Sequence, residues 1–314
     1  MLRPSNGSGW DLRVKAPRQM NETLKVLENE AIRAAFDPAC GRLRLIQTPR
    51  GSNHLWQPST LESEAPDWAR ASQRTFLLPQ AFWAQLSAVP QEAPEIDGAS
   101  WKVIEATSET LRMVSPITRH TGARVSVSLR LRGGEPALAF SYRVERLREA
   151  RHPIHLWFIA RVPLNGRFLI DSPGLVDRPC TRPCINLLRS ANFSGVFDEL
   201  DDAILLRESL PNSALKVGTF GRWIARIAEG EAFALITPEP QIGEPYLEES
   251  NLQFFSFPGR FSFAELEWTS PLHALRPGES FEAHAILAVL PVGEDSSNWP
   301  ARITEAAEAF RSEA

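Results

Sequence analysis

The sequence has few cysteines, and those it has do not form a recognisable framework. Its 314 residues include three, Cys40, Cys180 and Cys184, an odd and sparse set that argues against a disulfide scaffold. Cys180 and Cys184 lie in the proline-flanked stretch PCTRPC, and no second ligand pair of suitable spacing accompanies them. We therefore interpret this stretch as a loop and expect neither a metal nor another cofactor.

Clustered charge and long apolar runs are also missing. The 34 Lys and Arg are scattered, and the formal net charge is -4, so no basic surface for nucleic acid is indicated. No apolar stretch reaches the roughly 18 uncharged residues of a membrane span, and the first residues lack the apolar core of a signal peptide. We expect a cytoplasmic protein that binds neither nucleic acid nor a membrane. Its oligomeric state is left open.

Helical periodicity is scarce, whereas strand-like alternation recurs along the chain. The 25 prolines and 18 glycines suit many turns. The clearest hairpin joins residues 125–131 to residues 138–144 through a Gly-Gly turn. One helix is expected over residues 298–313, where Pro300 suits a first helical turn and an apolar stripe would dock on a sheet edge.

Together these patterns predict an all-β fold, a large antiparallel sandwich with a short C-terminal helix. No repeat of fixed length suggests a propeller. Residues 1–22 are polar and irregular, and we expect them to form a loosely held arm. Residues 23–314 are expected to form one domain.

Residues 263–291 carry the cleanest alternation and the most unusual placement of charge. Ala264, Leu266 and Trp268 alternate with Glu265 and Glu267 and with Thr269, so both carboxylates share one face of a strand, roughly 7 Å apart. Residues 276–279 form a turn, and a second strand follows. The acids either lie on a solvated outer face or line a concave surface where they could act as general bases.

Two other regions hold candidate site residues. Residues 57–100 are rich in proline and weakly periodic, which indicates a long loop that either builds a site with Gln80 and Trp83 or covers a sheet edge. The apolar strand HPIHLWFIARVP places His155 and Trp157 on one face. Either residue could instead belong to the core.

Several of these stretches together resemble the galactose mutarotase-like (aldose 1-epimerase) superfamily. The opening, LENEAIRAAFDPACGRLRLIQTPRGSNHLW, is similar to its first strands, and LEWTSPLHALRPGESFEAHAIL is similar to its closing hairpin. PQAFW, IDGASW, HLWFIARV and KVGTFGRW resemble a bacterial branch of it without assigned function. The resemblance spans most of residues 24–291 and implies a β-supersandwich with a sugar-binding concave face.

The resemblance also implies catalytic roles. Mutarotases take the proton of the sugar O1 with a Glu and protonate the ring oxygen with a His. Glu267 matches the base, with Glu265 beside it. The histidine position corresponds to Ile159, which cannot donate a proton, and His155 lies four residues earlier, about 13 Å away along a strand.

The remaining predicted contacts are sugar-binding ones. Aromatic rings suit the apolar faces of pyranoses, and amide or charged groups bind hydroxyls. The set is Gln80, Trp83, Trp157, Arg74, Lys216, Trp223 and His273. His273 is an alternative acid to His155.

Three functions remain open from the sequence. The first is an aldose 1-epimerase-like enzyme that interconverts sugar anomers. The second is a non-catalytic sugar-binding protein, which the missing histidine favours, and the third is an interaction protein on the same scaffold. The chain carries no phosphate-binding loop and no G-x-S-x-G motif, which disfavours kinases and serine hydrolases.

Overall fold

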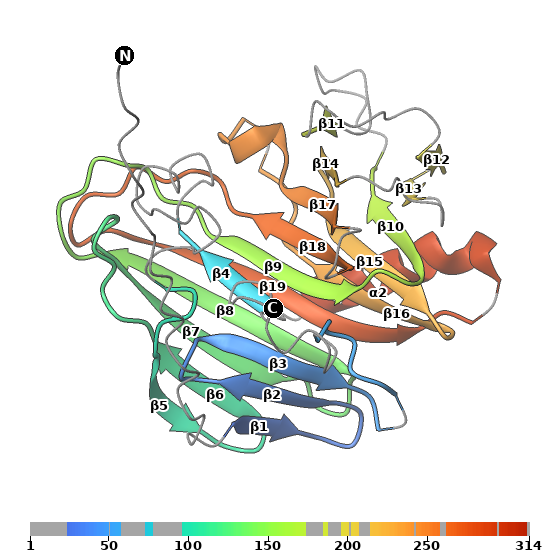
Figure 1. The fold of residues 1–314 in the computed structure, drawn as a ribbon, viewed down its shortest axis with the longest axis horizontal. Helices are drawn as coiled ribbons and strands as arrows, with labels where there is room; N and C mark the ends of the chain where they lie inside the picture. Colours follow the sequence, from blue (N-terminus) through green and yellow to red (C-terminus); the bar gives the residue numbers. More distant parts are fainter. Residues whose placement is uncertain are drawn as a thin grey trace, which may run out of the picture.

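The computed structural model describes residues 24–49, 51–57, 73–77, 96–173, 185–187, 196–200, 202–206, 214–241, 243–257, 262–293 and 295–312. Their strands form three antiparallel sheets (Figure 1), which confirms the predicted all-β class. Residues 1–22, Gln80, Trp83, Cys180 and Cys184 lie outside the described residues.

The largest sheet has ten strands, and all of its pairings are antiparallel. In sheet order the strands are β12 (Phe197–Glu199), β13 (Ala203–Leu206), β10 (Arg167–Asp171), β15 (Trp223–Ala228), β16 (Glu231–Ile236), β19 (Ser280–Pro291), β8 (Ala137–Arg146), β7 (Ala123–Leu131), β6 (Thr110–Val114) and β5 (Lys102–Ala106). The predicted hairpin is β7–β8, paired from Ala123↔Arg146 to Leu131↔Leu138.

The other two sheets are smaller. The six-stranded sheet runs β11 (Ile185–Asn186), β14 (Leu215–Thr219), β17 (Leu252–Phe257), β18 (Phe263–Thr269), β9 (Trp157–Pro163) and β4 (Gln73–Phe76). The three-stranded sheet runs β1 (Lys25–Glu28), β2 (Arg33–Asp37) and β3 (Arg42–Gln47).

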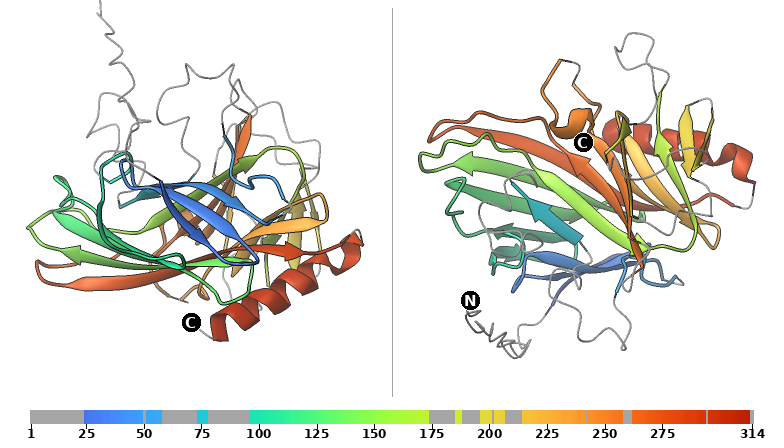
Figure 2. Two further views of the ribbon diagram at one scale, coloured as in Figure 1. Left: turned by 90° about the horizontal axis from the view of Figure 1, so that it is seen from below. Right: turned by 45° about the horizontal axis from the view of Figure 1, so that its top comes forward.

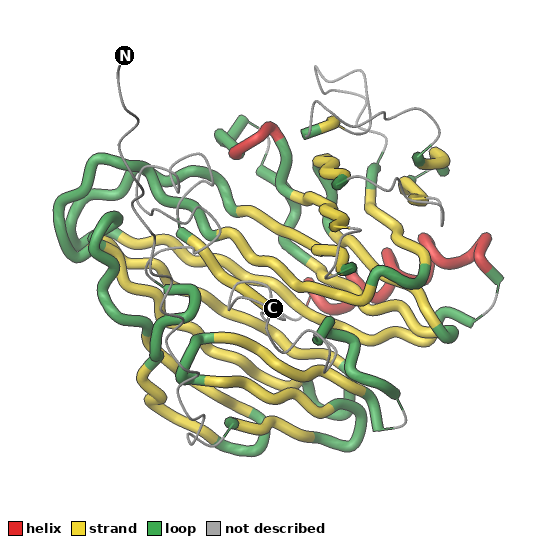
Figure 3. Tube along the Cα trace, viewed as in Figure 1, coloured by secondary structure: helices red, strands yellow, loops and turns green. Residues whose placement is uncertain are grey.

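The sheets form two layers around one large apolar cluster. Alternate residues of the six-stranded sheet, such as Phe158, Phe254 and Leu266, meet alternate residues of the ten-stranded sheet, such as Phe140 and Phe233. The three-stranded sheet contributes to the same cluster and lies beside the edge strand β4 (Figures 1 and 3). The face of the six-stranded sheet that points away from the ten-stranded sheet is called the outer face below.

The C-terminal helix α2 (Trp299–Ser312) lies on the far side of the ten-stranded sheet (Figure 2). Ile303, Ala307 and Phe310 of its apolar stripe are buried against strands β10, β15, β16 and β19. The stripe was predicted correctly, but the helix covers a sheet face rather than an edge, because small residues such as Ala225, Ala234 and Ala288 leave room for it. No helix in the described part of the chain is long and apolar enough to cross a membrane.

Two expectations about connections are wrong. β18 and β19 do not pair with each other: β18 lies between β17 and β9, whereas β19 lies between β16 and β8, so the chain crosses from one layer to the other at residues 270–279. Residues 57–100 are not entirely loop, since β4 pairs with β9 within them. Glu229 and Gly230 form the tight turn between β15 and β16, and both have left-handed φ, 56° and 78°.

Candidate functional site

Glu265 and Glu267 lie on the outer face, because Ala264, Leu266 and Trp268 of the same strand fill the core. Neither carboxylate is solvated: Glu267 is 1% exposed and Glu265 is 6% exposed. Two acids on a buried sheet face need compensating partners. Of the two alternatives that the sequence left open for these acids, the solvated face is therefore excluded. The residues around the two acids define the candidate site.

Register places these neighbours in two rows across the strands, and directly opposed residues of neighbouring strands point to the same face. The first row has Glu267 at its centre and consists of Gly218, Gln253, Glu267, Ile159 and Arg74. The second row has Glu265 and consists of Lys216, Phe255, Glu265 and Arg161. Ile159, which the sequence resemblance matched to the mutarotase histidine, lies directly opposite Glu267.

Glu267 is bound through one oxygen. The indole Nε1 of Trp157 donates a hydrogen bond of 2.9 Å to Oε2, and Lys216 Nζ lies 3.3 Å from the same oxygen. Burial raises the pKa of Glu267 to about 8; the Lys216 ammonium partly opposes this rise, while Glu265 and Glu248 add to it. At neutral pH Glu267 therefore holds a proton, as a group that exchanges protons with a substrate would.

Lys216 is shared between two carboxylates and an aromatic ring. Its Nζ is 3.6 Å from Glu248 Oε2, as well as 3.3 Å from Glu267, and it lies 4.7 Å from the ring centroid of Trp157. Burial lowers the pKa of Lys216, but the nearby carboxylates, Glu267 first, outweigh burial and raise it above its ordinary value. Lys216 remains an ammonium at neutral pH.

Glu265 forms a separate ion pair beside Glu267. Arg161 Nε donates to Glu265 Oε1 at 2.6 Å, and the guanidinium lies 4.3 Å from the ring centroid of Phe263. Both side chains are nearly fully buried. Because Glu265 accepts this bond from an arginine, it is less available than Glu267 for proton transfer.

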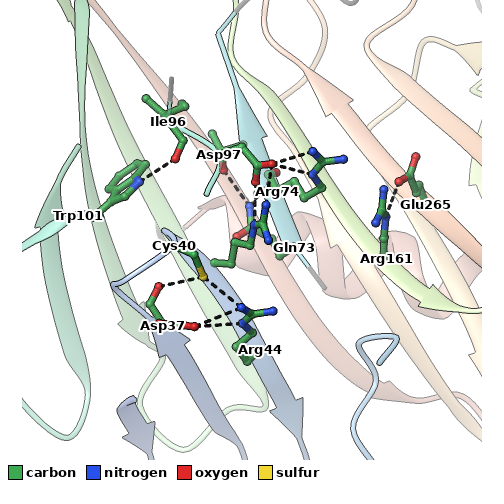
Figure 4. Close-up of polar contacts among 12 residues, drawn as sticks. Asp37, Cys40, Arg44, Gln73, Arg74, Ile96, Asp97, Trp101, Arg161 and Glu265 are labelled. Atoms are coloured by element: carbon green, nitrogen blue, oxygen red, sulfur yellow. Dashed lines mark hydrogen bonds and ion pairs between the residues drawn. The ribbon is translucent and has the colours of Figure 1, made fainter. Parts of the chain in front are cut away.

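A third buried ion pair ties the outer face to the three-stranded sheet (Figure 4). Asp97 accepts from Arg42 at 3.0 Å and from Arg74 at 2.7 Å. Burial would raise the pKa of Asp97, but Arg74 and Arg42 outweigh it and lower the value below the ordinary range. Asp97 therefore stays ionised and fixes Arg74 at the edge of the site.

Cys40 lies near Arg44 and Arg42, but its thiol is unreactive. Its Sγ is 3.2 Å from Arg44 Nη2 (Figure 4). Burial raises the pKa of the thiol to about 11, and only the thiolate is reactive.

Gln253 is a site residue that the sequence patterns did not single out. It is 1% exposed, and its Nε2 donates to Ser250 Oγ at 3.1 Å, while its buried Oε1 has no hydrogen-bond partner among the described residues. Gly218 permits this arrangement, since a Cβ there would lie 2.5 Å from Ser250 Oγ. A buried acceptor without a donor, directly opposite Glu267, suits a ligand hydroxyl. The only sequence signal was its alternation with the core residues Leu252 and Phe254.

The structure brings together five of the predicted site residues, Glu265, Glu267, Trp157, Arg74 and Lys216. Trp157 also packs on Phe76 with ring centroids 5.4 Å apart, and with Ile159 these rings form an apolar part of the outer face.

Three predicted residues lie apart from this group. His155 is fully buried beyond Trp157, with ring centroids 6.4 Å apart. His273 stacks on Phe281 at 3.8 Å, next to the bridge Ile154↔His273. Trp223 packs beneath α2, where its Nε1 donates to Thr304 Oγ1 at 3.0 Å, on the other side of the molecule. In the described part of the chain no group of three or more His, Cys, Asp or Glu could hold a metal ion.

The comparisons with known proteins give matches only at the level of structure. No protein-family model matches the chain, and no curated protein matches it. A galactose mutarotase-like protein from Lactobacillus casei ATCC 334 superposes with a TM-score of 0.56 at 11% identity, covering 85% of this chain and 100% of that one. A galactose mutarotase-related enzyme from Lactobacillus acidophilus gives 0.54 at 10%, covering 87% and 99%.

A third solved structure is that of a protein from Escherichia coli K12 named "putative aldose 1-epimerase". It superposes with a TM-score of 0.56 at 16% identity and covers 85% of this chain and 98% of its own. Likeness at such low identity concerns the fold and not the activity. The chain therefore has the galactose mutarotase-like fold that its sequence resemblance implied.

Proposed function

We propose that the protein binds a small sugar on the outer face of the six-stranded sheet and interconverts its anomers, with Glu267 as the group that exchanges protons with the sugar. The observation that carries this proposal is the environment of Glu267: a buried carboxyl group with its pKa raised to about 8. Enzymes raise carboxyl pKa values in this way to transfer protons near neutral pH.

The neighbours of Glu267 suit a pyranose. Trp157 and Phe76 offer aromatic surface for the apolar face of the ring. The free Oε1 of Gln253 accepts a hydrogen bond from a hydroxyl. Arg74, held by Asp97, places a positive charge at the other end of the same row. The roles of Gln80 and Trp83 remain predictions from the sequence, and His155, which lies apart from the group around Glu267, has no role in this proposal.

A non-catalytic sugar-binding protein is the second candidate. The observation that favours it is Ile159, which takes the mutarotase histidine position and lies directly opposite Glu267. Such a protein would use the same aromatic and polar contacts without accelerating any reaction.

Polarimetry separates the two candidates. The interconversion of α and β anomers of glucose and galactose is followed with wild-type protein and with Glu267→Gln. We expect wild-type protein to accelerate the interconversion and Glu267→Gln to lose most of this acceleration, because an amide does not exchange protons near neutral pH. Calorimetric binding of a sugar without any acceleration would instead establish the binding protein.

A further inference from the structure

The two oxygens of the Glu267 carboxyl group are not equivalent. Oε2 receives the hydrogen bond of Trp157 Nε1 at 2.9 Å and lies 3.3 Å from Lys216 Nζ. Within the described residues, every hydrogen bond and ion pair of Glu267 goes to Oε2. Oε2 is therefore fixed by two donors, and Oε1 is the oxygen left for a substrate.

Within the described part of the chain, the groups that face Glu267 do not include a good second acid. Its cross-strand partners are Ile159 on β9 and Gln253 on β17, and neither side chain gives up a proton. The charged groups around it are Lys216 on β14, Glu248 on the turn η3 (Leu247–Glu249) and Glu265 on its own strand. Arg161 on β9 is bound to Glu265. Lys216 is a poor acid even when Glu267 is protonated, because the carboxylates of Glu248 and Glu265 also stabilise its ammonium form.

We propose that Oε1 of Glu267 carries out both proton transfers of sugar ring opening, first as acid and then as base. This inference rests on the proposed function. In this mechanism the same oxygen also protonates the ring oxygen, the step that a histidine carries out in mutarotases. The ring oxygen and the anomeric hydroxyl oxygen are bonded to the same carbon, C1, so one carboxyl oxygen can reach both. A carboxyl group positioned against the sugar could then act without a partner on the opposite strand.

The proposed steps balance as follows. The protonated Oε1 donates its proton to the ring oxygen, and the bond between C1 and the ring oxygen breaks with its electron pair going to that oxygen. Oε1, now ionised, takes the proton of the anomeric hydroxyl, whose oxygen becomes the aldehyde carbonyl. The net change is one proton moved between two sugar oxygens, and Glu267 is again protonated. Rotation about the C1–C2 bond and reversal of the steps give the other anomer.

The surroundings of Glu267 suit both halves of this cycle. Burial raises its pKa to about 8, so the protonated form required at the start predominates at neutral pH. The ionised form that follows the first transfer is stabilised by the ammonium of Lys216 and the indole N–H of Trp157, both already aimed at Oε2. Glu248, 3.6 Å from Lys216 Nζ, keeps the lysine charged while Glu267 is neutral.

The pH dependence of the catalysed rate tests this proposal, because the two mechanisms give opposite slopes. If the protonated carboxyl group starts the reaction, kcat falls as pH rises through about 8. At higher pH the decrease in kcat approaches about tenfold per pH unit. A carboxylate base assisted by a separate acid would give a rate that rises through the same range. The spontaneous rate, measured at each pH with Glu267→Gln, is subtracted.

A matched variant removes the alternative acid. His155→Phe keeps a buried aromatic ring at this position and is expected to change kcat less than twofold. A falling pH profile with activity retained in His155→Phe supports the proposal. A rising profile, or loss of activity in a normally folded His155→Phe, overturns it while leaving the proposed function intact. No acceleration of any tested sugar by the wild-type protein refutes the proposed function and this mechanism with it.

Discussion

At the residue scale, the protonation of Glu267 links the candidate site to stability. Its pKa is raised from 4.5 to about 8 in the folded chain, first by burial. Between these values the folded state holds a proton that the unfolded state releases. The free energy of unfolding is then lowered as pH rises through this window, because the unfolded state binds fewer protons than the folded state.

We therefore predict that the stability of the wild type relative to Glu267→Gln decreases between pH 5 and pH 9, by on the order of 3 kcal/mol. Urea unfolding at several pH values measures this difference without any sugar. Glu249→Gln, which removes an exposed carboxylate two residues from the buried segment, serves as the control and should follow the wild type. A difference that stays constant across the window would show that Glu267 ionises normally.

Alternation along one strand was enough to predict the two acids, since Glu265 and Glu267 necessarily share a face. It could not predict their burial or their partners. Arg161 and Lys216 reach the acids only through the pairing of β9, β14, β17 and β18. Gln253 follows no motif, and IDGASW contains Asp97 without indicating its two arginine partners, because both roles come from contacts that form only in the folded chain.

At the element scale, the turn η3 holds Glu248 against Lys216 in a strained backbone. Glu248 and Glu249 both have left-handed φ, 56° and 52°, although neither is glycine. Each such residue costs about 1–2 kcal/mol. Strain of this kind is retained where surrounding contacts determine it, and here the ion pair of Glu248 with Lys216 is one such contact.

Glycine substitutions on this turn separate strain from the ion pair. Glu249→Gly is expected to raise the free energy of unfolding by about 0.5–1 kcal/mol, because glycine adopts positive φ freely. Glu248→Gly relieves the same strain but loses the contact with Lys216, so its gain should be smaller or absent. Thermal unfolding of both variants makes the comparison. Equal gains would mean that the contact contributes nothing to stability.

Elements with strong patterns were predicted well, and those held by pairing alone were not. The β7–β8 hairpin and the stripe of α2 follow directly from periodicity. β4 has only four residues, QRTF, and is a strand because β9 offers it hydrogen bonds. The separation of β18 from β19 was missed for a related reason, since a turn between two strands does not reveal in which sheet each strand pairs.

At the scale of the whole molecule, the candidate site and α2 lie on opposite sides of the sandwich (Figure 2). Ile303 is fully buried between α2 and the ten-stranded sheet. We predict that Ile303→Ala lowers the free energy of unfolding by about 2–4 kcal/mol and leaves sugar affinity unchanged. Denaturant unfolding and calorimetry measure the two quantities.

Glu305→Ala on the same helix is the control for this prediction. Glu305 is exposed, so the substitution should change stability by less than about 0.5 kcal/mol. A loss of sugar affinity in Ile303→Ala, measured well below its unfolding temperature, would contradict the separation of helix and site.

The crossing of the chain between layers at residues 270–279 also bears on how the protein folds. Because β18 pairs with β9, the hydrogen bond between Trp157 and Glu267 joins residues 110 positions apart. Contacts this distant form only after a long segment has closed, and chains dominated by them fold slowly. The site on the outer face therefore forms only once β9 and β18 have paired.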